Sequence, residues 1–248
     1  MASAWRAFEE DLARRRDAGR ATVFWWRDDD AGGPTENIGR LLGLAAASAV
    51  PLALAVVPEA AQPALFRMLH AGVAVLQHGS DHRNRAGPGE KKTEFPAAEP
   101  EEEALARIAA ARGRLESVAG AWLLPVLAPP WNRLRGTLLA RLPEIGLRGL
   151  STYGPRSAAE PTPGLRQVNT HVDIVAWRAG RGFIGEDEAL GQARRHLALQ
   201  SDEPTGWLSH HAAHEPASWA FLERLFDVTR RCGAHWAHPG TVFLPATR

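Results

Sequence analysis

Cysteine is almost absent from this chain of 248 residues, which contains only Cys232. A single thiol excludes an internal disulfide, and it cannot supply the thiolate cluster of a structural zinc site. We expect Cys232 to pack at the end of a helix.

Long apolar runs and dense basic runs are missing as well. The first twenty residues lack the apolar core of a signal peptide, and no later segment has enough uninterrupted apolar residues to cross a bilayer. The 29 basic and 28 acidic side chains nearly cancel, and no basic run would follow a phosphate backbone. We therefore expect a cytoplasmic protein that binds neither membranes nor nucleic acid, and its oligomeric state is left open.

Short runs rich in Val, Leu and Ala alternate with helical patterns, which is typical of repeated βα units. No linker divides the chain, so we expect one domain over residues 1–248, with an N-terminal helix within 1–20 that buries Trp5, Phe8 and Leu12. Strands are predicted at 21–27, 52–57, 73–77, 123–128, 147–152, 165–175 and 206–210, and helices at 35–48, 60–71, 100–119, 134–142, 185–200 and 215–231. This strand count favours a closed or nearly closed α/β barrel.

Three consecutive carboxylates, Asp28, Asp29 and Asp30, end the apolar run at residues 23–26. Like charges crowded together repel one another, so such a cluster indicates a compensating positive charge, either Arg27 or a metal ion. An HxxxH motif, residues 78–82, begins where another predicted strand ends. Because the carboxyl ends of parallel strands share one face of a sheet or barrel, the two groups are predicted to converge.

Each motif alone has a simpler interpretation. An acidic triplet before glycine is often a solvated turn whose carboxylate caps the next helix, here starting near Thr35. An HxxxH motif can arise by chance in a chain with ten histidines. The placement of both motifs at predicted strand ends is what indicates a site.

Two loops interrupt the βα pattern. Residues 80–99 are polar and rich in Gly and Pro, as suits a functional surface loop, and we expect them to form a wall of a substrate site. Residues 153–164 contain three prolines and are expected only to connect strands.

The order of motifs along the chain resembles the polysaccharide deacetylase family, also called the NodB homology domain or carbohydrate esterase family four. The resemblance covers roughly residues 20–243, and its motifs are weak singly but fairly specific in order and spacing. The residues that carry it are Arg27-Asp28-Asp29-Asp30, His78 and His82, Pro129-Pro130-Trp131, Asp173 and Trp177, and Leu208-Ser209-His210. It implies a distorted (β/α)7 barrel, which agrees with the independent strand count.

The resemblance implies that Asp29 is the general base and that Asp30, His78 and His82 bind a divalent metal ion. Two histidines and one carboxylate leave coordination positions for water and for a substrate carbonyl oxygen. We expect zinc, while cobalt, nickel and iron also suit these ligands. Asp28 is left as a surplus acid.

On an ideal strand, the proposed base and the proposed aspartate ligand would point to opposite faces. Successive side chains alternate between faces, so Asp29 and Asp30 can approach one water only if the chain bends here. Gly32 and Gly33, which follow, make such a bend reasonable.

By the same resemblance, His210 would be the general acid that protonates the leaving amine, a role suited to a side chain that exchanges protons near neutral pH. His211 would take this role if the strand register is shifted by one, and otherwise it supports the site from behind. A rival interpretation makes His210, His211 and His214 a separate zinc cluster.

The substrate cleft is predicted to include Pro130, Trp131 and Trp177, because aromatic faces suit sugar rings. Core packing is an equally simple interpretation of either tryptophan.

Two positions depart from the family pattern. The Arg-x-Pro box aligns with residues 128–131, so Ala128 stands where the family has an arginine that orients a catalytic acid. The Asp-x-x-Asp-Trp box aligns with residues 173–177, and Ala176 replaces its second aspartate. The two losses can be linked, because a charge and its partner vanish together at less cost than either alone. Asp173 and Arg27 are left as supporting residues around the base and the acid.

These observations predict a metal-dependent hydrolase that removes an N-acyl group, most simply acetyl, from a substrate containing an amino sugar. One alternative is a catalytically impaired protein that keeps the metal and binds carbohydrate. Another is a hydrolase of a non-sugar amide such as a cyclic ureide, because a fold alone does not fix the substrate. In each case the partner is a carbohydrate or a small N-acylated compound, and the missing signal peptide favours small intracellular conjugates.

Overall fold

The structure is a computed structural model, and it describes residues 3–244. The strands are β1 Val23–Ala31, β2 Leu52–Val56, β3 Val73–Gln77, β4 Leu123–Leu127, β5 Gly149–Leu150, β6 Arg166–Gln167, β7 Val172–Asp173, β8 Thr205–Ser209 and β9 His235–Trp236. They form one sheet in the order β6-β5-β4-β3-β2-β1-β8-β7, with β9 beside β1, and every pair is parallel. The carboxyl ends of these strands therefore share one face, as predicted.

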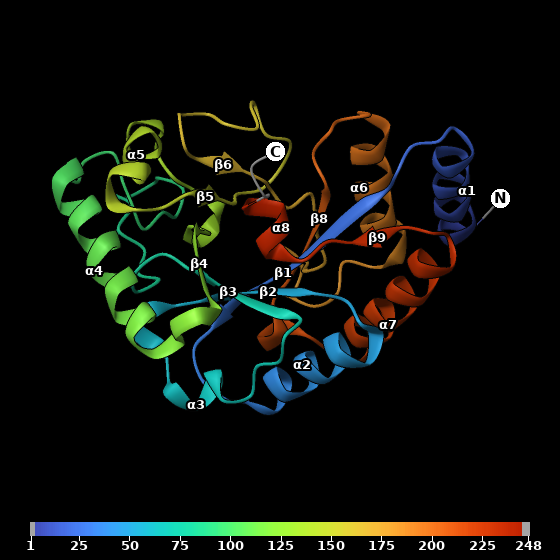
Figure 1. The fold of residues 1–248 in the computed structure, drawn as a ribbon, viewed down its shortest axis with the longest axis horizontal. Coiled ribbons are helices and arrows are strands. Elements are labelled where there is room, and N and C mark those ends of the chain that lie inside the picture. Colours follow the sequence, from blue (N-terminus) through green and yellow to red (C-terminus); the bar gives the residue numbers. More distant parts are fainter. Residues whose placement is uncertain (1–2, 245–248) are drawn as a thin grey trace.

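All the helices except α8 cover the outside of this sheet. They are α1 Ala4–Asp17, α2 Glu36–Ser48, α3 Pro63–Phe66, α4 Glu101–Ala119, α5 Gly136–Arg141, α6 Glu186–Ala198, α7 Pro216–Arg231 and α8 Pro239–Phe243. Helices α1, α6 and α7 lie together on one side of the molecule, and α4 and α5 lie on the other (Figure 1). No helix in the described part of the chain is both long and apolar enough to cross a membrane.

The predicted strand 165–175 is interrupted, and the interruption closes the barrel. Early in this segment, Val168 donates its backbone N–H to Leu150 O (3.1 Å), as a neighbour of β5. Later, His171 donates to Gly206 O (2.7 Å), as a neighbour of β8. One extended segment thus changes partners part-way, which joins the two edges of the sheet into the distorted α/β barrel.

Two further sequence predictions need correction. The helix predicted at 60–71 is wrong in extent, because only Pro63–Phe66 is α-helical, and a separate 3-10 turn, Pro58–Ala60, precedes it. Each turn starts at a proline, whose missing N–H suits a first turn and prevents continuation of a preceding helix. The short elements β9 and α8 were not predicted, because two and five residues are too few to repeat a recognisable pattern.

Alternation along β1 and β2 fills the barrel. Trp25 packs with Ala53 and Ala55 in a cluster built from strands and from α8, so these side chains point inward. The alanines leave room for the indole, and Phe243 of α8 packs edge-on against it at 5.3 Å. Helix α8 thus fills the interior near the start of β1, away from the carboxyl ends.

The opposite faces of the same strands pack against the helices. Trp5, Phe8 and Leu12 of α1 are buried, which confirms the predicted N-terminal helix and its apolar face. Phe8 lies 6.3 Å from Phe24 and 6.4 Å from Trp207, measured between ring centroids. The predicted position of Cys232 at a helix end is also confirmed, since it caps α7.

Candidate active site

Strand β1 continues through the acidic triplet and bends within it. Its register against β2 shifts between Asp28 and Ala31, and Asp30 has a φ of 69°, in the left-handed region. The predicted bend is therefore present, and it lies at Asp30 itself rather than at the following glycines. It turns Asp30 out of the alternation that would have placed it on the same face as Asp28.

The three predicted metal ligands are brought together. The Oδ1 atom of Asp30 lies 3.1 Å from Nε2 of His78 and 3.1 Å from Nε2 of His82. All three possible ligand atoms lie within 4.8 Å of one another. This convergence joins the end of β1 to the turn after β3.

The donor chemistry of this cluster fits a divalent cation. His78 Nδ1 lies 2.8 Å from Ala128 O, so Nδ1 carries the proton and the lone pair of Nε2 faces Asp30. Burial lowers the pKa of His78, but Asp29 and Asp30 outweigh burial and raise it. Burial raises the pKa of Asp30, but the neighbouring His78 and His82 rings hold it well below its usual range. Acceptors that face one another need a cation between them, and two nitrogens with one carboxylate suit zinc and related ions.

The turn between the two histidines depends on Gly79 and Glu94. Gly79 has a φ of +64°, and a side chain there would collide with the carboxylate of Glu94 and the ring of Pro130. Glu94 is buried and accepts backbone hydrogen bonds from Ser80 (2.9 Å) and Asp81 (3.0 Å). The predicted loop at 80–99 therefore folds back to fix the turn that presents His78 and His82.

The predicted base, Asp29, is paired with Arg27 on the same strand. Arg27 Nη2 donates to Asp29 Oδ2 at 3.0 Å, and Nε makes an ion-pair contact with Oδ1 at 2.9 Å. The guanidinium is fully buried and is held from the other side by Ser151, whose carbonyl and hydroxyl oxygens accept from Nη1 at 3.1 and 2.7 Å. Asn132 Oδ1 accepts from Nη2 at 2.6 Å. Ser151 and Asn132 were not predicted as site residues, since no local sequence signal marks them.

Trp131 and Asn132 occupy a strained turn after β4. Their φ values are 55° and 56°, and such a backbone is unfavourable for a bulky residue such as tryptophan. The turn places the Trp131 ring 4.7 Å from the His82 ring, while Asn132 reaches Arg27. Pro130 is buried just before them. Trp131, which was predicted to line the cleft, thus adjoins a proposed metal ligand, and Asn132 contacts the arginine that is paired with Asp29.

The predicted acid, His210, faces Asp29. Its Nε2 lies 3.9 Å from Asp29 Oδ2, and its ring meets Trp177 edge-to-face at 4.6 Å. Trp177 is 44% exposed and donates Nε1–H to Asp173 Oδ2 at 2.7 Å, so it lies at the surface of the site rather than in the core. Burial raises the pKa of Asp173. Asp173 therefore holds the tryptophan that packs against His210.

His211 has a different partner, Asp28. Its Nδ1 lies 2.6 Å from Asp28 Oδ1, and Ser209 donates its hydroxyl to Asp28 Oδ2 at 2.6 Å. Burial lowers the pKa of His211, but Asp28 outweighs burial and raises it. Asp28 is therefore no surplus acid, because it is fully buried in a hydrogen-bonded pair. His210, rather than His211, faces Asp29, and His214 does not join these two in a metal-ligand cluster within residues 3–244.

A second buried cluster, near the start of β8, was not predicted. His171 Nε2 lies 3.3 Å from Glu203 Oε2, and the rings of His171 and His196 stack at 3.5 Å. The backbone N–H of Gly206 donates to His171 Nδ1 at 3.0 Å, which leaves the proton of the neutral ring on Nε2, facing Glu203. This arrangement favours an internal hydrogen bond over a metal ion.

No family model and no curated protein matches this sequence. Solved structures do match it over most of its length. The chain has the fold of the polysaccharide deacetylases. The Bc1960 peptidoglycan N-acetylglucosamine deacetylase is 16% identical with a TM-score of 0.61, and the match covers 90% of this chain and 88% of that one.

Two other matches are similar in extent. The polysaccharide deacetylase Bc1974 from Bacillus cereus is 16% identical with a TM-score of 0.55, covering 88% and 91% of the two chains. A family 4 carbohydrate esterase from Streptomyces lividans, in complex with acetate, is 16% identical with a TM-score of 0.54, covering 87% and 90%. The distorted barrel expected from the sequence is thereby confirmed.

Proposed function

We propose that this protein is a divergent polysaccharide deacetylase, a metal-dependent hydrolase that removes an N-acetyl group from a substrate containing an amino sugar. The observation that carries the proposal is the convergence of Asp30, His78 and His82 beside Asp29 at the carboxyl ends of the strands. The fold shared with solved deacetylases supports it.

A divalent ion held by these three residues would supply a Lewis acid that polarises an acetyl carbonyl and acidifies water. Asp29 would accept a proton from the attacking water, and Arg27 would hold its carboxylate in place. His210, whose Nε2 lies 3.9 Å from Asp29 Oδ2, would give a proton to the leaving amine nitrogen. The backbone N–H of Trp131 would stabilise the negative charge that develops on the carbonyl oxygen.

The pairing of Arg27 with Asp29 bears on whether the protein is an enzyme. A non-catalytic carbohydrate-binding role was suggested by the missing arginine at position 128. Arg27 approaches the carboxylate of Asp29 from its own strand, and Ser151 and Asn132 hold it there. Arg27 therefore positions the proposed base without an arginine at position 128.

The test is acetate release by metal-loaded protein from a panel of N-acetylated amino sugars, including oligomers and phosphorylated conjugates. We expect turnover of at least one class of substrate and none in the Asp29→Asn variant at equal metal content. Absence of acetate from the entire panel, with Asp29→Asn indistinguishable from wild type, would reject the proposal. If acetate is released only from non-sugar amides, the proposed substrate class is wrong, and the proposed hydrolytic mechanism stands.

A further inference from the structure

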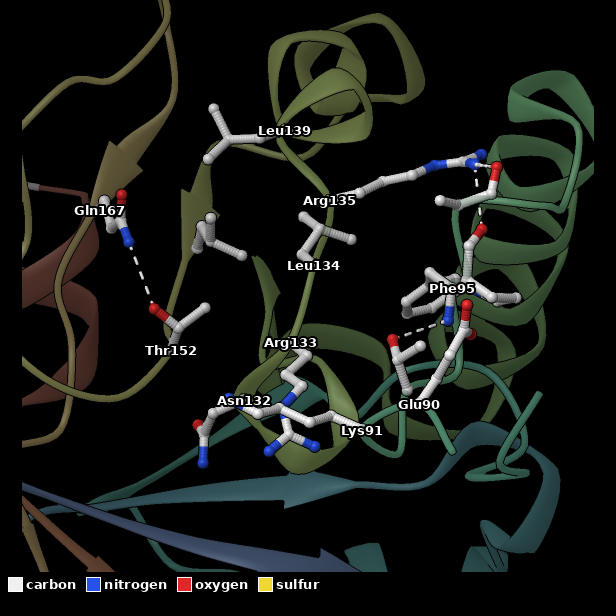
Figure 2. Close-up of a pocket in the computed structure, with 14 residues that line it drawn as sticks. Glu90, Lys91, Phe95, Asn132, Arg133, Leu134, Arg135, Leu139, Thr152 and Gln167 are labelled. Atoms are coloured by element: carbon white, nitrogen blue, oxygen red, sulfur yellow. Dashed lines mark hydrogen bonds between the residues drawn. The ribbon is translucent and has the colours of Figure 1, made fainter. Parts of the chain in front are cut away.

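A cavity of about 530 Å³ opens next to the candidate active site. Its volume lies in the range of roughly 300 to 1,000 Å³ that is typical of small-molecule sites. Its walls come from the loop at 80–99, from residues 132–139, and from the ends of β5 and β6 (Figure 2). The loop expected to form a substrate wall therefore does line a cavity.

The cavity and the proposed base share supporting residues. Asn132 lines the cavity, and its Oδ1 accepts from Arg27, which is paired with Asp29. Thr152 lines the opposite wall and directly follows Ser151, the other residue that holds Arg27. A substrate whose acyl group reaches Asp29 can therefore extend into this cavity.

The lining carries unbalanced positive charge. Lys91, Arg133 and Arg135 line the cavity with a single acid, Glu90, which accepts a hydrogen bond from the backbone of Gly87. Within residues 3–244, none of the three cations forms a salt bridge, whereas most other arginines of this part do. The chain as a whole carries a net charge of only +1, so this local excess is not a general property of its surface.

The three cationic side chains differ in how many hydrogen bonds they already make within the protein. Arg135 turns away from the cavity, and its Nη1 donates to three backbone carbonyl oxygens (Figure 2). The Arg133 side chain donates one hydrogen bond, from Nη1 to Lys92 O at 2.6 Å, and its other N–H groups make no hydrogen bond to a described residue. Lys91 is exposed, and its ammonium makes no hydrogen bond to a described residue. Lys91 and Arg133 are therefore the groups available to an anion.

The floor of the cavity is apolar. Four of its lining side chains, Phe95, Leu134, Leu139 and Leu150, belong to or pack against one hydrophobic cluster. A free inorganic anion gains nothing from such a floor, because burial without hydrogen bonds is unfavourable for a charged group. A ligand that combines an anionic group with an apolar or planar part matches both the rim and the floor.

We propose that this cavity binds the phosphate-bearing part of the substrate, an organic phosphate ester linked to the N-acetylated amino sugar. This inference rests on the proposed deacetylase function for the position of the sugar, but not for binding itself. Lys91 and Arg133 contact the phosphoryl oxygens, and the apolar floor receives the group esterified to the phosphate. A nucleoside and an isoprenyl chain both satisfy this chemistry.

Binding is measured first, on the inactive Asp29→Asn protein, by calorimetry and by amine labelling. Lys91 and Lys92 are the only lysines in the chain, and Lys92 does not line the cavity, so it is an internal reference. We expect a nucleoside diphosphate sugar or an isoprenyl diphosphate sugar to protect Lys91 from an acylating reagent several-fold more than Lys92. Equal labelling with and without every phosphate ester would overturn the inference.

Charge removal supplies the matched comparison. Lys91→Gln and Arg133→Gln are each expected to weaken binding about five- to tenfold, with the loss reduced at high salt. The control is Arg67→Gln, which removes an exposed arginine outside the cavity and should leave affinity unchanged. An equal loss in the control would show a general charge effect and reject the site.

The ligand series separates the two sources of the ester and tests the floor. Whichever of the nucleoside and isoprenyl conjugates binds more tightly identifies the group on the floor. Both are expected to bind at least tenfold more tightly than the N-acetylated sugar 1-phosphate. Equal affinity of the simple sugar phosphate would overturn the role of the apolar floor.

Binding and turnover measurements together distinguish a failure of this inference from a failure of the proposed function. If phosphate esters bind through Lys91 and Arg133 but no acetate is ever released, the deacetylase function fails and the binding site stands. If neutral oligomers are hydrolysed, and Lys91→Gln and Arg133→Gln leave kcat/KM unchanged for every substrate, the function stands and the inference fails.

Discussion

Arg27 and Asp29 lie two residues apart on β1 and meet as a two-point ion pair, with Nη2 3.0 Å from Oδ2 and Nε 2.9 Å from Oδ1. Residues two apart on a strand point to the same face, so the strand itself aligns the pair. Both side chains are buried, and burial makes such a pair costly to break by removing one member. The base is thus positioned from within its own strand.

Replacement of Arg27 by lysine should separate positioning from charge. Lysine keeps the charge but not the planar fork, so we expect retained metal, a fall in kcat of about ten- to a hundredfold and a smaller change in KM. Steady-state kinetics and metal analysis measure these effects. The control is Arg156→Lys, which alters another buried arginine, paired with Asp202 at 2.9 Å, and should leave kcat unchanged. Equal losses of kcat in both variants would contradict a positioning role for Arg27.

The metal ligands and the base should respond differently to substitution. His78→Ala, His82→Ala or Asp30→Asn should each remove most bound metal, because too few protein ligands remain. Asp29→Asn should keep the metal and abolish turnover, because it removes a base but no ligand. Metal analysis after dialysis, with parallel activity assays, distinguishes the two classes. A variant Asp29→Asn that lost its metal would place Asp29 among the ligands.

Asp28→Asn should reduce stability without removing metal. The substitution leaves His211 and Ser209 facing an uncharged partner in a buried site, so we expect unfolding to become easier by about 1 to 3 kcal/mol. Chemical unfolding measures the change, and metal content should stay at the wild-type level. Loss of metal with unchanged stability would show that the assignments of Asp28 and Asp30 must be exchanged.

Gly79→Ala should disturb the metal site through the backbone. The residue has a φ of +64°, and the added methyl group would collide with Glu94 and Pro130, so the turn carrying His78 and His82 must move. We expect metal affinity to fall at least tenfold. Gly89→Ala is the control, because Gly89 has a similar φ of +79° with no atom within 4 Å of the added group. Equal affinity in both variants would rule out the proposed collision.

The protein should lose stability as the pH falls from about 6.5 to 4. Burial, the largest cause, lowers the pKa of His196 to about 4, and it also lowers the pKa of His214 to about 4. In the unfolded chain these histidines have pKa values near 6.5, so they bind protons over this window while the same side chains in the folded protein stay neutral. The free energy of unfolding therefore decreases as the pH falls. Between pH 6.5 and 4, the His196→Gln variant should lose less stability than the wild-type protein, and the difference between the two losses should be up to about 3 kcal/mol. Urea unfolding at several pH values checks this, and an unchanged slope would count against it.

The sequence determined the order of most strands and helices, and it determined which strand ends carry Asp29, Asp30, His78 and His82. Periodicity encodes these features locally, and parallel connections place strand ends on one face. The bend at Asp30 could be inferred as necessary, but its location could not, because it depends on pairing with β2. The brief strands β6 and β7 were read as one strand, because their extended backbones form a single sequence pattern.

Only the tertiary structure decided the partners of the charged groups. Asp28 meets His211 across 183 positions, and Arg27 meets Ser151 across 124. Alternation along a strand says which face a side chain takes, but not which side chain arrives there from another strand. That choice depends on strand register and on side-chain packing, and these give Asp28 its partner His211 and Arg27 its contact with Ser151.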